Sequence, residues 1–92
     1  MAHPVFRLEA HFAGRVQGVG FRYTARQIAQ GFEVTGQVRN LPDGRVHLIA
    51  EGRETEVHEF VREIQSQLTH HIKETTSSPL AGPAQFRDFQ IA

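Results

Sequence analysis

The chain is 92 residues long, with 39% hydrophobic and 22% charged residues. A chain of this length and composition is expected to fold as one globular domain, spanning residues 1–92, that buries about 60–65% of its unfolded surface. Ten basic and ten acidic residues cancel and cysteine is absent, which excludes disulfides, zinc–thiolate sites and an overall positive field that would attract nucleic acid.

A first strand is predicted over residues 5–13, because apolar and polar residues alternate there. The apolar face consists of Phe6, Leu8, Ala10 and Phe12. The face expected to be wetter consists of Val5, Arg7, Glu9 and His11. After a glycine-containing loop, a helix is predicted over residues 21–30, with an apolar stripe of Phe21, Ala25, Ile28 and Ala29. Gly31 is expected to end this helix in the left-handed conformation.

A hairpin is predicted next. Residues 33–39 alternate in polarity, the segment NLPDG at 40–44 has turn chemistry, and residues 46–50 resume the alternation. A second helix is expected from Thr55, a candidate N-cap, with an apolar stripe of Val57, Phe60, Val61, Ile64 and Leu68. Strands are expected at 71–75 and 84–91, separated by a loop rich in Ser, Pro and Gly at 76–83.

The predicted order of elements is strand, helix, strand, strand, helix and strand, with a short extra strand at the C-terminal end. This order predicts an α+β fold, the ferredoxin-like βαββαβ sandwich, in which an antiparallel sheet carries both helices on one face. Many functions share this topology, so the function has to be inferred from a site.

The loop over residues 14–20 has the features of an anion site. Gly14, Gly18 and Gly20 allow successive backbone N–H groups to turn inward, and the following helix start adds free N–H groups and the positive end of its dipole. Arg22 can donate two parallel hydrogen bonds to the same anion. The spacing matches neither the dinucleotide motif nor the P-loop motif. On spacing alone, a tight turn with a solvated Arg22 is an equal alternative.

Two motifs resemble the signatures of the acylphosphatase family. The segment GRVQGVGFR at 14–22 resembles its first signature, and NLPDGRVHLIAEG at 40–52 is similar to its second. The resemblance extends over nearly the whole chain and includes the closing segment GPAQFRDFQI. The main departure is Gln37, where the family usually has an aromatic residue. We expect this difference to change local packing more than catalysis.

The resemblance implies hydrolysis of the carboxyl–phosphate bond of an acyl phosphate to a carboxylate and inorganic phosphate. Arg22 and the loop amides would hold the phosphoryl group, and Asn40 would orient the attacking water. The implied substrate-binding residues are Arg15, Val16, Gln17, Gly18, Val19 and Gly20. No metal or cofactor is expected, because an arginine and a ring of N–H groups supply the donors that phosphoryl transfer needs.

The chemistry of Asn40 is compatible with this role. Its amide group can orient a water but cannot remove a proton, and no general acid or base is assigned. A carboxylate leaves readily without protonation, whereas the alkoxide of a phosphate monoester does not. We therefore expect activity on acyl phosphates and little on sugar phosphates. The alternative is that Asn40 only begins the turn, where asparagine is favoured.

The histidines are weaker candidates. A metal pair of His11 and His47 across the sheet is conceivable, but without a carboxylate partner at ligand spacing we expect both to be inert. His70 and His71 are adjacent, so on a strand they would face opposite sides.

Two other classes of function remain as alternatives: a non-catalytic module that binds phosphate or RNA, and a domain that handles carbamoyl phosphate within larger hydrogenase-maturation proteins. RNA binding would require exposed aromatic residues on the open sheet face, where polar residues are expected. The length of 92 residues argues against a domain within a larger hydrogenase-maturation protein. We expect a small acyl phosphate as substrate, no nucleic-acid or membrane partner, and a monomer, although a sheet edge is open to pairing. The first ten residues contain no long apolar run, so we expect no signal peptide and a cytoplasmic location.

Overall fold

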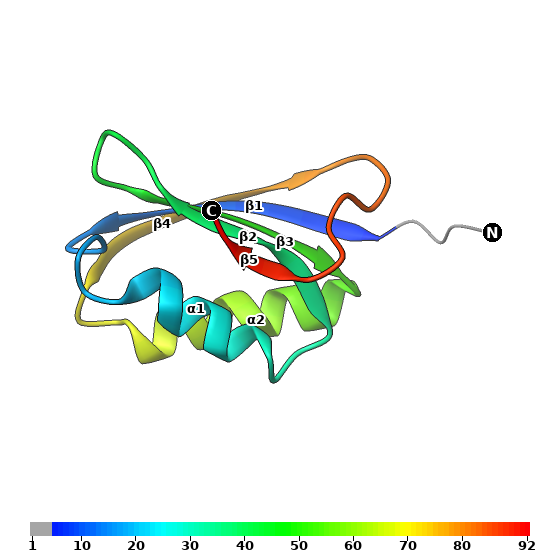
Figure 1. Ribbon diagram of the computed structural model, residues 1–92, viewed down its shortest axis with the longest axis horizontal. Coiled ribbons are helices and arrows are strands. Elements are labelled where there is room, and N and C mark those ends of the chain that lie inside the picture. The colour runs from blue at the N-terminus through cyan, green and yellow to red at the C-terminus, as the bar shows by residue number, and fades with distance from the viewer. Residues whose placement is uncertain (1–4) are drawn as a thin grey trace.

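The computed structural model describes residues 5–92 as a sheet covered on one face by two helices (Figure 1). Residues 1–4 lie outside the described residues. The predicted domain and the segment without an expected signal peptide both include them. The elements are β1 (Phe6–Gly14), α1 (Phe21–Ala29), β2 (Val34–Asn40), β3 (Val46–Gly52), α2 (Glu54–Gln67), β4 (Ile72–Leu80) and β5 (Phe89–Ile91). The predicted ferredoxin-like order with a short extra C-terminal strand is therefore confirmed.

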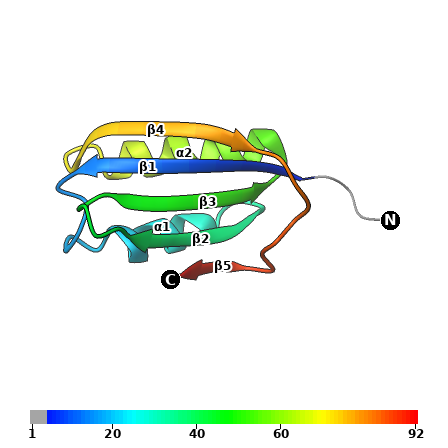
Figure 2. The same ribbon diagram turned by 90° about the horizontal axis from the view of Figure 1, so that it is seen from above.

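The strands lie in the order β4-β1-β3-β2-β5 (Figure 2). β1 pairs antiparallel with β3 and with β4, and β2 pairs antiparallel with β3. The exception is β5, which runs parallel to β2. It can do so because residues 81–88 cross from the β4 edge of the sheet to the β2 edge (Figure 2).

The core lies between the sheet and the helices. The predicted apolar faces of β1, α1 and α2 form it together with apolar side chains of β2 and β3, and the ring centroids of Phe12 and Phe21 lie 5.1 Å apart within it. Each large side chain that is fully buried there contributes about 1.5–3 kcal/mol to folding. None of the helices in the described part of the chain is long and apolar enough to cross a membrane.

The last two strands differ from the prediction. β4 continues to Leu80 through most of the expected loop, and residues 84–88 are not a strand. β4 is an edge strand that pairs with β1 along its length, with Pro79 opposite Leu8. An edge strand tolerates proline because one of its sides has no partner strand. The Ser and Pro content of this segment therefore marks an edge and not a loop.

The helix ends also differ from the prediction. Gly31 is not in the left-handed region, because α1 ends at Ala29 and the chain continues in right-handed turns through Gln30. The N-cap of α2 is Arg53, which has no side-chain capping bond, so the expected cap Thr55 lies inside the helix. Two acidic residues in the first turn of α2 interact favourably with the positive end of the helix dipole instead.

The open face of the sheet is partly covered by residues 81–88. Nε of Arg7 donates to Glu51 at 2.7 Å, and these side chains are only 6% and 1% exposed. Glu51 accepts hydrogen bonds from the backbone N–H groups of Gln85 and Phe86, and Arg7 donates to backbone oxygens of the same segment. Arg7, expected on the wetter face, is thus buried because the crossing segment packs over it.

Replacement of Gly36 by alanine is expected to destabilise the fold by at least about 3 kcal/mol. Gly36 has a φ of +151°, and a Cβ there would lie 1.8 Å from the backbone oxygen of Ile49 on β3. Urea unfolding followed by circular dichroism measures the loss. Gly31→Ala is the matched control, because its φ is ordinary and the nearest atom is 3.5 Å away. Equal midpoints for the two variants would contradict this account of Gly36.

Candidate active site

A pocket of about 170 Å³ opens where the loop after β1, the start of α1 and the end of β2 meet. It is small compared with the roughly 300–1,000 Å³ of pockets that enclose a drug-sized ligand, so it suits a group the size of phosphate. The residues that line it are Val16, Gly18, Gly20, Phe21, Arg22, Tyr23, Asn40 and Ile91. The structure therefore brings Arg22, Asn40 and three of the predicted loop residues together.

The backbone of the loop has the form of an anion cradle. Gly18 and Gly20 have φ values of +77° and +78°, and Gly20 is the N-cap of α1. Within the described chain, no backbone hydrogen bond has its donor in the amides of residues 16–20. The first turn of a helix adds further free amides. These N–H groups are therefore available to an anion beside the positive end of the helix dipole.

The remaining predicted loop residues have other positions. The backbone N–H of Arg15 donates to the oxygen of His71 at 2.9 Å, so this amide is already engaged. Val16 lines the pocket but buries its side chain in the core, with 1% exposure. Val19 is exposed and does not line the pocket. Of the predicted substrate-binding set, Arg15, Gln17 and Val19 thus do not line the pocket.

Gln17 connects the loop to the hairpin. Its Nε2 donates to the backbone oxygens of Leu41 at 2.8 Å and Arg45 at 2.9 Å. These bonds hold the β2–β3 turn against the loop, which places Asn40 beside the cradle. The motif resemblance implies that Gln17 binds substrate, and in the structure its side chain bonds to the hairpin backbone.

Arg22 lies half-buried in the first turn of α1, at the pocket. Its Nη1 lies 3.4 Å from the oxygen of Ala92, a long hydrogen bond. Across residues 5–92, it makes no ion pair with an aspartate or a glutamate. Its guanidinium is therefore free to pair with an anionic group in the pocket.

Asn40 is the last residue of β2 and lies opposite Val46, a core residue of β3. Its side chain thus faces the helix layer and the pocket. The side-chain oxygen Oδ1 is buried and has no hydrogen-bond partner within the described chain. A buried polar atom without a partner is costly, and such atoms are often completed by water or a ligand.

Two apolar residues at the pocket were not identified from the sequence. Tyr23 is 61% exposed and Ile91 is 38% exposed. Tyr23 follows Arg22 directly in the predicted helix, so its position in the sequence could have identified it as a residue near the site. The position of Ile91 depends on the course of residues 81–88 and on parallel pairing with β2, for which the local sequence has no signal.

The histidines on the open face have a carboxylate partner that the sequence analysis did not expect. His11 and His47 are opposite each other on β1 and β3, and Nε2 of His47 lies 2.8 Å from Oε2 of Glu9. Glu9 was a detectable partner, because residues two apart on a strand share a face. The hydrogen bond with His47 lowers the pKa of Glu9, and burial lowers that of His11.

The other two histidines lie elsewhere. His70 and His71 belong to the turn between α2 and β4, and not to a strand as expected. The helix ends at Gln67 and β4 begins only at Ile72, so the turn occupies the residues between them. The argument from opposite strand faces therefore does not apply to this pair.

Comparisons with known proteins identify the family of this chain. The sequence model of the family described as Acylphosphatase matches residues 8–91. The acylphosphatase of Archaeoglobus fulgidus is 46% identical over 64% of this chain and 66% of its own length, and that of Acaryochloris marina is 52% identical over 59% and 58%. The acylphosphatase of Lactobacillus gasseri is 35% identical over 85% of this chain and 88% of its own length.

Solved structures agree with this family. Acylphosphatase from Bacillus subtilis is 28% identical, has a TM-score of 0.84 and is matched over 95% of this chain and 98% of its own. HypF from T. kodakarensis is 26% identical with a TM-score of 0.82, and this chain spans 12% of it. The predicted resemblance is thus confirmed in sequence and in structure.

Proposed function

Because the chain belongs to the acylphosphatase family, we propose that its pocket hydrolyses the carboxyl–phosphate bond of small acyl phosphates. Curated relatives that carry the name acylphosphatase support this reaction, including one matched over 95% of this chain. The observation that carries the proposal is the unpartnered Oδ1 of Asn40, in the same pocket as Arg22 and beside the free loop amides.

In this proposal Arg22 and the amides of residues 16–20 bind the phosphoryl oxygens. Their donors are fixed before the reaction, so they stabilise the charge that the equatorial oxygens carry in the transition state. Two parallel hydrogen bonds from the guanidinium would also fix the orientation of the phosphoryl group.

Asn40 would hold the nucleophile. Its Oδ1 accepts a hydrogen bond from a water and aims the oxygen of that water at phosphorus. As the bond from water to phosphorus forms, the bond from phosphorus to the acyl oxygen breaks, and its electron pair leaves with the carboxylate. The proton of the water passes to a phosphate oxygen, so the products are a carboxylate and inorganic phosphate. No side chain is needed as a general base.

Substrate preference tests this function. The purified protein is expected to hydrolyse an aryl acyl phosphate with a kcat/KM at least about 100-fold above that for a sugar phosphate, because only the monoester needs general acid catalysis, worth 10²–10⁴-fold. Steady-state rates at neutral pH measure both substrates. Equal rates, or a folded protein that hydrolyses neither, would contradict the proposal.

A domain that handles carbamoyl phosphate within a larger protein is the second candidate, and the observation beside it is that this chain matches 12% of the much longer HypF from T. kodakarensis. Carbamoyl phosphate in the same assay separates the candidates. If this chain hydrolyses the aryl substrate without any other protein, the result supports the first candidate, hydrolysis of small acyl phosphates. Phosphate binding without hydrolysis of either substrate supports a non-catalytic module.

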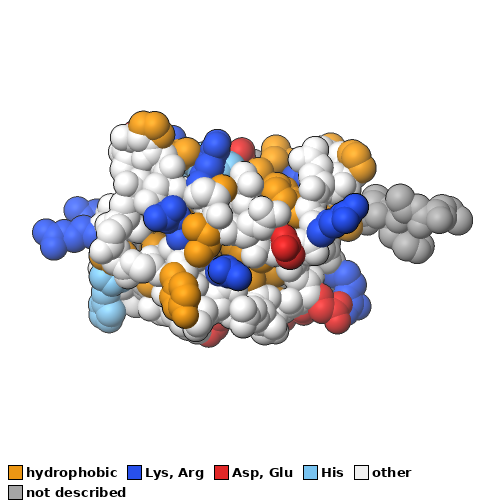
Figure 3. Space-filling view, in the orientation of Figure 1, with side chains coloured by type: hydrophobic (Ala, Val, Ile, Leu, Met, Phe, Trp, Pro, Cys, Tyr) orange, Lys and Arg blue, Asp and Glu red, His pale blue; other side chains and the backbone are white. Residues whose placement is uncertain are grey.

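The remaining expectations are part of the proposal. On the face shown in Figure 3, basic side chains lie in separate groups and form no continuous patch, which supports a small substrate over a nucleic acid. We retain a monomer, a cytoplasmic location and a single domain over residues 1–92 as predictions.

A further inference from the structure

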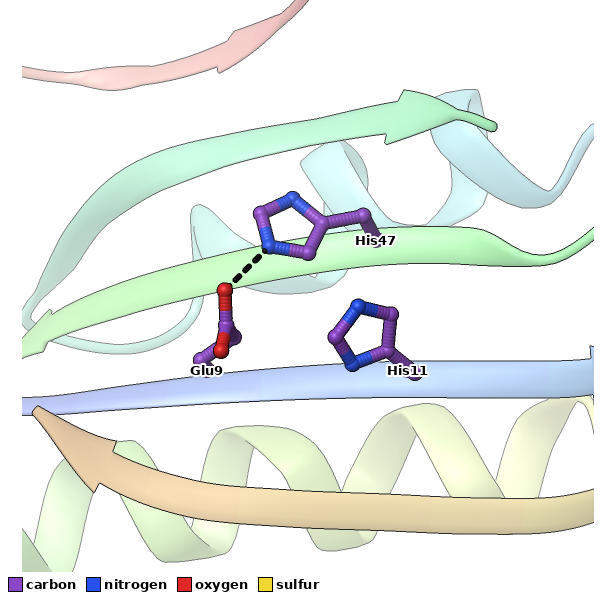
Figure 4. Close-up of side chains that lie close together, drawn as sticks. All are labelled: Glu9, His11 and His47. Carbon is purple, nitrogen blue, oxygen red and sulfur yellow. Dashed lines mark hydrogen bonds and ion pairs between the residues drawn. The ribbon is translucent and has the colours of Figure 1, made fainter. Parts of the chain in front are cut away.

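The open face of the sheet carries three side chains of the kind that bind metal ions. Glu9 and His11 extend from β1 and His47 extends from β3 toward them, on the face away from the helices (Figure 4). One possible ligand atom from each lies within 4.8 Å of the other two. The pocket is lined by other residues, so the cluster is separate from the site of the proposed function.

The spacing is close to that of a three-ligand metal centre. Oε2 of Glu9 and Nε2 of His47 are 2.8 Å apart, and the rings of His11 and His47 have centroids 4.9 Å apart. A tetrahedral zinc ion about 2.0–2.1 Å from each ligand separates neighbouring ligand atoms by roughly 3.3 Å. Rotation of the side chains, without a change of strand register, would bring the three atoms to this spacing.

The donor set selects a class of metal. Two imidazole nitrogens and one carboxylate oxygen match the three protein ligands of zinc sites that keep a fourth position for water. Calcium and magnesium prefer all-oxygen sites. A cation can reach the cluster from solvent, because the Glu9 side chain is 33% exposed and His11 is only partly buried, while His47 is 5% exposed and anchors the site.

We propose that Glu9, His11 and His47 form a binding site for Zn²⁺ or a similar divalent transition metal. The metal would take the place of the proton between His47 and Glu9, and that proton would be released. The bound ion would connect β1 to β3 on the face opposite the pocket. It would therefore raise stability by linkage without taking part in hydrolysis.

Two features of the surroundings limit the affinity. Nδ1 of His47 is buried without a hydrogen-bond partner in the described chain, whereas a metal-bound histidine usually donates its second N–H to an acceptor. The lack of such a partner typically weakens a site by 10–100-fold. Arg39, opposite His47, and Arg45 add positive charge near the cluster, which Asp43 offsets in part.

The first test is a calorimetric titration of the untagged, chelator-treated protein with zinc chloride at pH 7.5. We expect one equivalent of Zn²⁺ to bind to the parent chain. His11→Gln and Glu9→Gln are each expected to weaken binding by at least tenfold, because each removes one of three ligands. His11 is the more suitable position for a variant, because it is only partly buried and the fold depends on it less than on His47.

The control variants are His70→Gln, a histidine in an exposed turn, and His3→Gln, at the third position of the sequence. Both are expected to bind Zn²⁺ like the parent chain. Zinc is also expected to raise the thermal unfolding midpoint of the parent and of both controls, but not of His11→Gln. Unchanged binding by His11→Gln, loss of binding in either control, or no binding at 1 mM zinc would each overturn the proposal.

An activity measurement keeps this proposal distinct from the proposed function. The rate of acyl phosphate hydrolysis is expected to be the same with Zn²⁺ and with chelator, since the cluster lies across the sheet from the pocket. A protein without hydrolase activity that still binds one Zn²⁺ at the cluster would contradict the proposed function alone.

Discussion

Replacement of Arg22 by lysine is expected to lower kcat/KM for an aryl acyl phosphate by about 10³-fold. An arginine that stabilises charge in phosphoryl transfer is typically worth 10³–10⁵-fold, and lysine keeps the charge but not the two parallel hydrogen bonds. Arg22 is suited to this role because it lies at the pocket and makes no ion pair with an acidic side chain in the described chain. Steady-state kinetics of the parent and Arg22→Lys measure the loss.

Two further measurements separate binding from structure. Inorganic phosphate, as a competitive inhibitor, is expected to bind Arg22→Lys at least tenfold more weakly than the parent, because the ground state uses the same guanidinium. Arg26→Lys is the matched control: Arg26 is one turn further along α1, is exposed and does not line the pocket. A variant Arg22→Lys that keeps more than a tenth of the parent kcat/KM would exclude bidentate binding by Arg22.

Most of the fold could be predicted because local pattern and tertiary burial agree. The alternation in β1 and the apolar stripes of α1 and α2 correspond to the buried faces of these elements. Apart from the helix ends, the errors lie in segments whose structure depends on a contact with a distant part of the chain. β4 is a strand through Pro79 because β1 offers it a partner, and Arg7 is buried because residues 81–88 cross above it.

The candidate site also combines features that the local sequence predicts with features that depend on distant contacts. Motif resemblance identified Arg22, Asn40 and the glycine loop, which the structure places around one pocket. It did not distinguish Gln17, which connects the loop to the hairpin, from residues that could bind substrate. The missing information was the distance between two loops that are far apart in sequence, and no local pattern encodes that distance.

The Gln17 contacts also indicate how the two motifs would cooperate in the proposed reaction. Each motif supplies half of the proposed chemistry: the loop holds donors for the phosphoryl group, and the hairpin holds an acceptor for water. An attack in line with the leaving oxygen requires both halves at fixed separation. The two hydrogen bonds from Gln17 to the hairpin backbone provide that constraint beside the pocket.

Replacement of Asn40 by alanine is expected to lower kcat by about 10²–10³-fold while KM changes little. The amide would orient water and not the substrate, so its loss removes an interaction that acts mainly in the transition state. Steady-state kinetics with the same aryl acyl phosphate separate kcat from KM. Asp43→Ala is the matched control, because Asp43 lies in the same turn, bonds to Arg45 and is exposed.

Stability distinguishes this role from that of a residue that only begins the turn. Because Oδ1 of Asn40 is buried without a partner, the alanine variant removes an uncompensated polar atom and is expected to be as stable as the parent or slightly more stable, by up to about 1 kcal/mol. A turn-forming asparagine would give the reverse result, a lower urea midpoint with kcat unchanged. Loss of activity together with retained or increased stability is therefore the combination that the water-orienting role predicts and the turn-forming role does not, since active-site residues commonly lower stability in exchange for function.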